Sequence, residues 1–307
     1  MPRNKGFFTK VKDFIVWNLV KALMRLIQAI PWSLLPRFSH WIGNTILKTM
    51  PRRKGIALNN LEIALGEGLS NIERENILKK SMSEVVLGGA EILRYLSHPP
   101  DSFLAKIDFQ GKEYLDQALR QGRGVICFGA HFGNFPLMLM ALANTGYPVF
   151  AITREPKNAR LAHFFDRLKE QAGIGYISDK PKDICLRRAL QCLRGNNILF
   201  LQIDLNVISG AVWAEFFGKL VPTYPGAVIL ALRTGAPLIP LFIYRRDTLF
   251  HKIVAGPPIP LDITGNKEKD LVKNLSRLNK VIEEFIRQDP TAWWWLHRRW
   301  RKARPLI

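Results

Sequence analysis

The chain has 307 residues, enough to bury one large domain or one domain with an appendage. Its formal net charge of +20 points to one of two partners, a nucleic acid or an anionic membrane surface. Four of the 8 tryptophans lie among arginines in the stretch 293–301, which favours a lipid–water interface, and no helix-turn-helix, zinc or aromatic RNA-binding signature supports nucleic acid. We therefore expect an anionic membrane surface as a partner and no nucleic acid.

The segment 14–35 is rich in Trp, Leu, Ile and Val. As a helix it would be about 33 Å long, enough to cross a hydrocarbon core. Its polar residues Asn18, Lys21, Arg25 and Gln28 recur at helical spacing, so they form one stripe. That stripe favours a helix lying in the headgroup plane, with a membrane span and a core helix as alternatives. In the two membrane cases the preceding basic residues place this end in the cytoplasm.

A helical region is predicted from Pro51 to about Leu96, and a capping box at Ser70–Glu73 starts one of its helices. His98-Pro99-Pro100-Asp101 ends this region, because a Pro-Pro pair cannot continue a helix. We therefore divide the chain into an N-terminal membrane-docking helical region, 1–98, and an α/β domain, 99–307.

From Ile107 onward strand-like and helix-like segments alternate, which predicts an α/β fold. We expect a mixed, largely parallel central sheet with helices on both faces. Strands are predicted at 107–110, 124–129, 148–153, 174–178, 198–204, 211–217, 238–244 and 249–255, and helices at 136–145, 158–172, 182–194, 224–234 and 268–287.

Residues 291–302 are dense in Trp and Arg, and we predict a last amphipathic helix there. In such a helix Trp293, Leu296, His297 and Trp300 share one face. Arginines around that face can reach lipid phosphates, so we expect a second membrane contact at this end. We interpret His297 as a packing or interfacial residue rather than a catalytic one.

The segment 124–136 contains the strongest candidate for chemistry. A short apolar run ends at Gly129, and His131 follows two residues later. Pro136 suits the first turn of the next helix, where a missing N–H costs nothing. In an open α/β sheet, ligands bind at the carboxyl ends of the strands, and a histidine there is placed for proton transfer near neutral pH. We predict that His131 is a general base.

Four blocks of sequence, in this order along the chain, resemble those of the bacterial lipid A biosynthesis acyltransferases. These late lauroyl and myristoyl transferases belong to the wider lysophospholipid acyltransferase group. The blocks are Arg52-Arg53-Lys54 with Ala57-Leu58-Asn59-Asn60-Leu61; Gly124 to Asn134; Phe216-Phe217-Gly218 with Thr223, Gly226 and Thr234-Gly235-Ala236-Pro237; and Trp294-Trp295-Leu296-His297-Arg298-Arg299-Trp300.

The resemblance implies an acyltransferase that moves a fatty acyl chain from a thioester to a hydroxyl of a membrane glycolipid, such as a lipid A precursor. The donor is acyl carrier protein or acyl-CoA, and no metal or nucleotide cofactor is needed. The implied location is the cytoplasmic face of the cell inner membrane. In the family motif a histidine is followed, after four residues, by an acid that orients its imidazole.

This chain departs from that motif, because the position of the acid is occupied by Pro136. Asp204 and Glu215 are candidate replacements, and a backbone carbonyl is another. We favour Asp204, which follows the strand 198–202 and so lies at a carboxyl end as His131 does. The catalytic residues predicted are therefore His131 and Asp204. The alternative is a weakly active or non-catalytic lipid-binding relative.

Five further residues are predicted to bind substrate. Asn134 could donate to a carbonyl or simply cap a helix. Arg154 and Arg167 could meet a phosphate of the acceptor or of the carrier's phosphopantetheine, or they could be ordinary surface charges. Thr223 and Gly226 resemble a family turn in which backbone N–H groups approach an anion or oxyanion, and a plain turn is the alternative.

Overall fold

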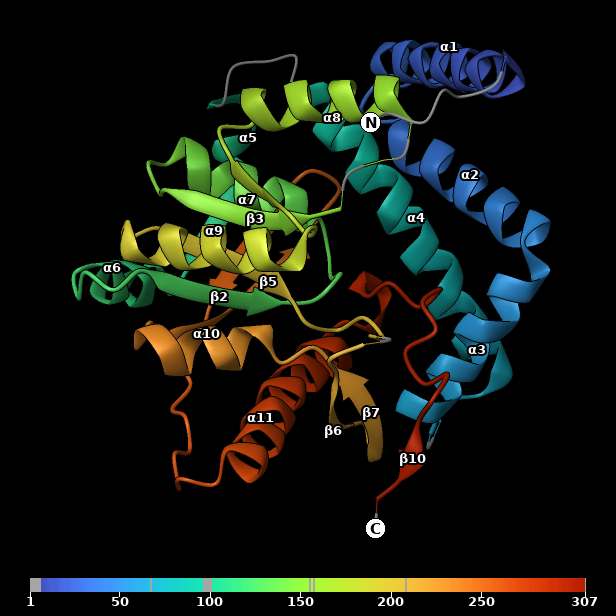
Figure 1. The fold of residues 1–307 in the computed structure, drawn as a ribbon. Helices are drawn as coiled ribbons and strands as arrows, with labels where there is room; N and C mark the ends of the chain where they lie inside the picture. The colour runs from blue at the N-terminus through green and yellow to red at the C-terminus, as the bar shows by residue number, and fades with distance from the viewer. Residues whose placement is uncertain are drawn as a thin grey trace.

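The computed structural model describes residues 7–66, 68–95, 101–154, 156, 158–207 and 209–306. Within these ranges a central sheet of seven strands runs in the order β1-β9-β8-β2-β5-β3-β4 (Figure 1). Every pairing in it is parallel except that of β8 with β9. The strands are β1 (Ile107–Gln110), β2 (Val125–Gly129), β3 (Val149–Thr153), β4 (Gly175–Ser178), β5 (Ile198–Gln202), β8 (Leu238–Arg245) and β9 (His251–Ala255).

Strand β2 shows why helices cover both faces of this sheet. All of its residues are buried, and alternate side chains enter different cores. Ile126 and Phe128 pack with α9, α10 and α11, whereas Val125 and Cys127 pack with α6 and α7. The predicted largely parallel α/β fold is thereby confirmed. These helices are α6 (Lys112–Leu119), α7 (Phe135–Asn144), α9 (Lys182–Arg194), α10 (Gly226–Thr234) and α11 (Lys267–Gln288).

A small antiparallel sheet, in the order β10-β7-β6, lies beside α11. Strand β6 (Val212–Phe216) was expected, whereas β7 (Lys219–Thr223) and β10 (Arg304–Pro305) were not. The guanidinium of Arg304 lies 4.0 Å from the centre of the Trp213 ring, so the last residues are held on this sheet by a cation–π contact.

The N-terminal part of the chain is helical, as predicted. The capping box is present: Ser70 Oγ and the Ser70 N–H each lie 2.7 Å from Glu73 Oε2, and the Glu73 N–H donates back to Ser70 Oγ. Residue 98, where we placed the domain boundary, lies outside the described residues. The helices are α1 (Phe7–Ala29), α2 (Leu35–Thr49), α3 (Pro51–Leu65), α4 (Asn71–Tyr95) and the short α5 (Asp101–Leu104).

Helix α1 packs on α8 (Ala159–Gln171) of the α/β part, through an edge-to-face contact between Trp17 and Phe164 with ring centres 5.6 Å apart. Arg160 of α8 also lies over the Phe14 ring, at 5.1 Å. In the part of the chain that the structure describes, no helix is both long and apolar enough to cross a bilayer.

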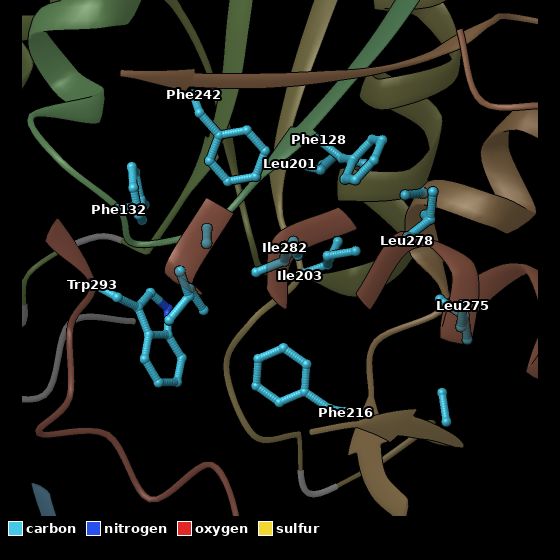
Figure 2. Packing of buried hydrophobic residues seen from close by; sticks show 14 of the residues in the cluster. Phe128, Phe132, Leu201, Ile203, Phe216, Phe242, Leu275, Leu278, Ile282 and Trp293 are labelled. Atoms are coloured by element: carbon cyan, nitrogen blue, oxygen red, sulfur yellow. The ribbon is translucent and has the colours of Figure 1, made fainter. Parts of the chain in front are cut away.

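The helix expected at 291–302 is absent, and this prediction was wrong. One turn of 3₁₀ helix, Pro290–Ala292, is followed by an irregular segment with turns. Trp293, Trp295 and Trp300 are each no more than 6% exposed, so these tryptophans belong to the core and not to a membrane surface. Figure 2 shows Trp293 beside Phe132 and Phe216, among side chains from the sheet and α11.

Side chains of α3 and α4 hold this irregular segment in place, so segments from opposite ends of the chain lie side by side (Figure 1). The buried Asn60 amide donates to the carbonyl oxygens of Trp295 and His297, at 2.8 and 2.6 Å. The Ser81 hydroxyl donates to the Trp293 carbonyl at 2.7 Å. These bonds satisfy carbonyls that an irregular backbone cannot pair by itself.

We predict that Asn60→Ala lowers the free energy of unfolding by about 2–4 kcal/mol, because it leaves two carbonyl oxygens without their donor. Denaturant unfolding of the purified protein in detergent measures this loss. Asn59→Ala is the matched control, since Asn59 is the exposed neighbour on the same helix. Equal stability of the two variants would contradict the role given to Asn60.

Candidate active site

His131 lies in the loop between β2 and α7, at the carboxyl end of a central strand. Gly133 shapes this loop, since it has φ of 55° and a Cβ there would collide with the carbonyl oxygen of Ile243. Pro136 stands in the first turn of α7, as predicted. The loop therefore turns sharply, and it leaves the His131 side chain 26% exposed.

Asp204 lies next to His131, just beyond the end of β5. Three donors converge on its carboxylate, which is 1% exposed. Its Oδ1 lies 2.9 Å from His131 Nδ1, and its Oδ2 accepts from the His131 backbone N–H and from Trp293 Nε1, both at 2.9 Å. The parallel pairing of β2 with β5 brings the two residues together, because it aligns the ends of these strands.

The environment changes the pKa of both partners. Burial alone would raise the pKa of Asp204, but His131 and the Trp293 indole outweigh it and hold that pKa below the usual value. Burial alone would lower the pKa of His131, but the charge and hydrogen bond of Asp204 outweigh it and raise the pKa. The pair is therefore suited to holding a proton on the imidazole once it has been accepted.

The hydrogen bond to Asp204 also sets the tautomer of His131. An ionised carboxylate only accepts, so Nδ1 carries the hydrogen in the neutral ring and Nε2 keeps a free lone pair. Among the described residues Nε2 has no hydrogen-bond partner, and the Phe135 ring stands edge-to-face with the imidazole at 5.6 Å. A partly exposed imidazole with this tautomer can act as a base toward a molecule that enters from solvent or from a membrane.

The C-terminal segment forms the other wall of the loop. The Trp294 N–H donates to the His131 carbonyl oxygen at 3.0 Å, and the Gly133 N–H donates to that of Ala292 at 2.8 Å. Phe132 and Trp293 form an isolated antiparallel bridge between these two bonds. The backbone on both sides of His131 is therefore fixed by residues far away in sequence.

Asn134, predicted to bind substrate, caps α7 and ties the loop to α4. Its Oδ1 accepts from the Leu137 N–H, while its amide nitrogen donates to Gly88 O at 3.2 Å and to Glu91 Oε2 at 2.9 Å. Both hydrogens of the amide are thus directed at α4. Direct contact of Asn134 with a substrate carbonyl stays a prediction.

Glu91, which sequence reasoning missed, is the centre of a buried ionic network. It pairs with Arg245 and lies 3.2 Å from His251 Nε2. Burial would raise the pKa of Glu91, but the bonds from Arg245 and His251 lower it to about 2. Glu91 therefore remains ionised and holds Asn134 from the side of α4. An isolated acid in the middle of an amphipathic helix gives no sequence signal for this role.

A cavity adjoins the His131 loop at Gly133 and Asn134. Its other walls carry the charged side chains of Lys80, Glu84 and Arg245. Such a lining suits a polar group and not an acyl chain.

Thr223 ends β7 and Gly226 begins α10, on either side of a short turn. Thr223 is fully buried, and its Oγ1 accepts from Arg299 Nη2 at 2.8 Å. Arg299, also fully buried, donates in addition to the carbonyl oxygens of Leu205 and Pro222. The turn is thereby joined to the residue that follows Asp204. Contact of Thr223 and Gly226 with an anion stays a prediction.

The two predicted arginines lie outside this buried network. Arg154 follows β3 with 78% of its side chain exposed, and its Nε lies 2.9 Å from Asp179 Oδ2. Arg167 is exposed on α8 and forms no hydrogen bond or ion pair with the described residues. Their binding to a phosphate stays a prediction.

His297 is closer to this site than its interpretation as a packing residue suggested. Its Nδ1 accepts from the Asn206 N–H at 3.4 Å, two residues after Asp204. Burial lowers the pKa of His297 to about 4. The charge of Asp204 opposes this shift, whereas the positive charges of Arg299, His131 and Arg53 add to it. The ring is therefore neutral at physiological pH.

A sequence model of the family described as "Bacterial lipid A biosynthesis acyltransferase" matches residues 2–302. The chain belongs to the bacterial lipid A biosynthesis acyltransferase family. It is an acyltransferase, as the ordered blocks predicted. A lipid A biosynthesis lauroyltransferase of Escherichia coli K12 is 25% identical over 99% of this chain and 97% of its own length.

Two further relatives agree with this assignment. A lipid A biosynthesis acyltransferase of Haemophilus influenzae is 26% identical over 99% of this chain and 96% of its own length. A lipid A biosynthesis myristoyltransferase of E. coli K12 is 23% identical over 88% of this chain and 80% of its own length. In this acyltransferase Pro136, at the place of the motif's acid, stands in the first turn of α7, and Asp204 is the carboxylate at the histidine.

We predict that Asp204→Asn lowers the pKa of His131, because burial continues to disfavour the imidazolium while the opposing charge is lost. The pKa is measured by NMR of ¹³C-histidine-labelled protein, with His131→Gln to assign the signal. Asp183→Asn, a change at an exposed ion pair, is the charge-matched control. An unchanged or higher pKa in Asp204→Asn would contradict the coupling.

Proposed function

We propose that this enzyme transfers an acyl chain from a thioester to a hydroxyl of a membrane glycolipid and that His131 is its general base. The 2.9 Å bond between His131 Nδ1 and Asp204 carries this proposal. The acceptor oxygen attacks the thioester carbonyl carbon as Nε2 takes its proton. The tetrahedral intermediate then collapses, the C–S bond breaks, and Nε2 returns the proton to the leaving thiolate.

Asp204 supports this cycle in two ways. It holds the imidazole in the tautomer that exposes Nε2, and it stabilises the imidazolium that forms when the proton is taken. Trp293 positions Asp204 in turn, since its indole donates to the oxygen that does not face the imidazole ring. In this account Asn134 acts by fixing the start of α7.

The relatives act in lipid A biosynthesis by their names, so the proposed acceptor is a lipid A precursor. The proposed donor is an acyl thioester on acyl carrier protein or coenzyme A. Arg154 and Arg167 are exposed on the side of β3 and α8, where a phosphate of either substrate could approach. We place the enzyme on the cytoplasmic face of the inner membrane.

The absence of the motif's acid at Pro136 raised the alternative of a weakly active or non-catalytic lipid-binding relative. The imidazole–carboxylate pair supports full activity over that alternative, because a buried, ionised partner for His131 is already in place.

We propose that residues 1–98 dock the 99–307 domain on an anionic membrane surface, with α1 lying in the interface. Ile15, Leu19 and Leu26 recur at helical spacing, and each is at least 52% exposed. They form an apolar stripe beside the polar one, which contains the exposed Lys21 and Arg25. A helix with this arrangement buries its apolar stripe below the headgroups and leaves its cations among the phosphates.

Replacing His131 by Ala is expected to lower kcat by about 10²–10⁴-fold, the usual contribution of a general base. The measurement is transfer of a radiolabelled acyl chain from acyl carrier protein to a lipid A precursor. His163→Ala, at an exposed position on α8, should leave the rate unchanged. Undiminished turnover in a folded His131→Ala enzyme would end the proposal.

The double variant L19D/L26D should bind vesicles of phosphatidylethanolamine and phosphatidylglycerol at least about tenfold more weakly, because each Leu loses its apolar transfer energy. Vesicle co-sedimentation measures this. The control pair L232D/I263D changes two exposed apolar residues outside the N-terminal region. Equal binding by both pairs would show that α1 does not dock the enzyme.

A further inference from the structure

Four arginines from opposite ends of the chain lie where the start of α3 meets the C-terminal segment. Arg52 and Arg53 stand in the first turn of α3, while Arg298 and Arg301 belong to the C-terminal segment. Arg53 Nη1 donates to the carbonyl oxygen of Leu296 at 3.3 Å, and the Asn60 amide, two helical turns further along α3, holds the same segment. We call these four side chains the arginine cluster.

The cations of this cluster repel one another without compensation. The pKa of Arg298 is lowered chiefly by the neighbouring charge of Arg52, with Arg301 and Arg53 adding to it. Among the described residues none of the four forms an ion pair. The next cation along α3, Lys54, differs in being paired with Glu75 at 2.8 Å. Positive side chains that have no ion-pair partner, on segments joined by hydrogen bonds to the backbone, are typical of an anion-binding site.

His297 connects the arginine cluster with the catalytic pair. Its ring accepts from the N–H of Asn206, two residues after Asp204, and its backbone carbonyl accepts from Asn60 on the helix that carries Arg53. Because its Nδ1 accepts from the Asn206 N–H, the neutral ring carries its hydrogen on Nε2. A group bound by the arginines thus has a neutral donor between it and His131.

We propose that the arginine cluster binds a phosphate group of the acceptor glycolipid and that His297 donates a hydrogen bond to the sugar between that phosphate and the attacking hydroxyl. This inference rests on the proposed function. Guanidinium groups bind phosphate in a bidentate fork, which places a headgroup as well as attracting it.

A lipid is the favoured source of the phosphate because exposed apolar residues lie on the chain that leads into the cluster. Met50, directly before it, is 43% exposed, and Trp41 on α2 is 62% exposed. A phosphorylated sugar at a bilayer surface can therefore reach the cluster while its acyl chains stay in the membrane. Binding of an acidic carrier protein at the same arginines is an outcome that the experiment separates.

The test compares wild type with R52A/R298A on two acceptors in mixed micelles: a phosphorylated lipid A precursor and the same lipid after phosphatase treatment. Neither arginine side chain makes a hydrogen bond with the described residues, so the fold should be kept, which circular dichroism verifies. We expect the KM for the phosphorylated acceptor to rise about tenfold with kcat nearly unchanged. We expect no difference between the enzymes on the dephosphorylated acceptor, and partial recovery in R52K/R298K.

The matched control is R194A/R233A, which removes two exposed arginines elsewhere. Three results would overturn the inference. An equal rise in KM for both acceptors would indicate general attraction to the membrane, and a raised KM for acyl carrier protein alone would indicate that the arginines bind the carrier. An unchanged KM for the phosphorylated acceptor would show that they do not bind its phosphate. If wild type transfers no acyl chain, the proposed function fails. Binding of the two lipids in phosphatidylcholine vesicles then still decides the arginine site.

Discussion

The site depends on one buried carboxylate. Removing an ionised Asp from water costs several kcal/mol unless its oxygens are paired, and Asp204 is paired by the His131 ring, the His131 backbone and the Trp293 indole. Each donor is placed by a different part of the structure. The register of β2 with β5 places the His131 ring, the shape of the loop places the His131 backbone N–H, and the distant C-terminal segment supplies the Trp293 indole. The same carboxylate raises the pKa of His131 and fixes its tautomer, so structure and proposed chemistry depend on a single interaction.

The C-terminal segment links the two halves of this arrangement. Backbone bonds to His131 and Gly133 set one side of the His131 loop, and the Asn60 and Ser81 side chains hold the segment from α3 and α4. The N-terminal helices thereby contribute to the geometry of the site as well as to the proposed membrane contact. The blocks at the two ends of the sequence are parts of one structure, which explains why both accompany the histidine block.

Most of the sheet could be predicted from the sequence, because its buried strands are short, β-branched and separated by amphipathic helices. The proximity of Asp204 to His131 followed from the same pattern, since parallel strands end at a common edge. Strand β7 was missed because Lys219–Thr223 carries a charge and Pro222, which are poor strand signals on an antiparallel ribbon.

The C-terminal segment could not be predicted for a different reason. The spacing of Trp293, Leu296 and Trp300 satisfies a helical period, but the Trp293 indole and the carbonyl oxygens of Trp293 and Leu296 bind partners that only the tertiary structure supplies. Tertiary contacts therefore override the local pattern, and the position of Trp293 on Asp204 had no sequence signal. Glu91 was missed similarly, because its partners Arg245 and His251 lie on distant strands.

The claim that Asp204 has taken over the role of the acid missing at Pro136 is tested most directly by the turnover of Asp204→Asn. The measurement is single-turnover acyl transfer from acyl carrier protein to a lipid A precursor at a pH where wild-type His131 is neutral. Our account predicts a loss of about 10⁴-fold, the cost of removing the orienting carboxylate in a comparable triad. A folded Asp204→Asn enzyme that transfers acyl chains at the wild-type rate would contradict it.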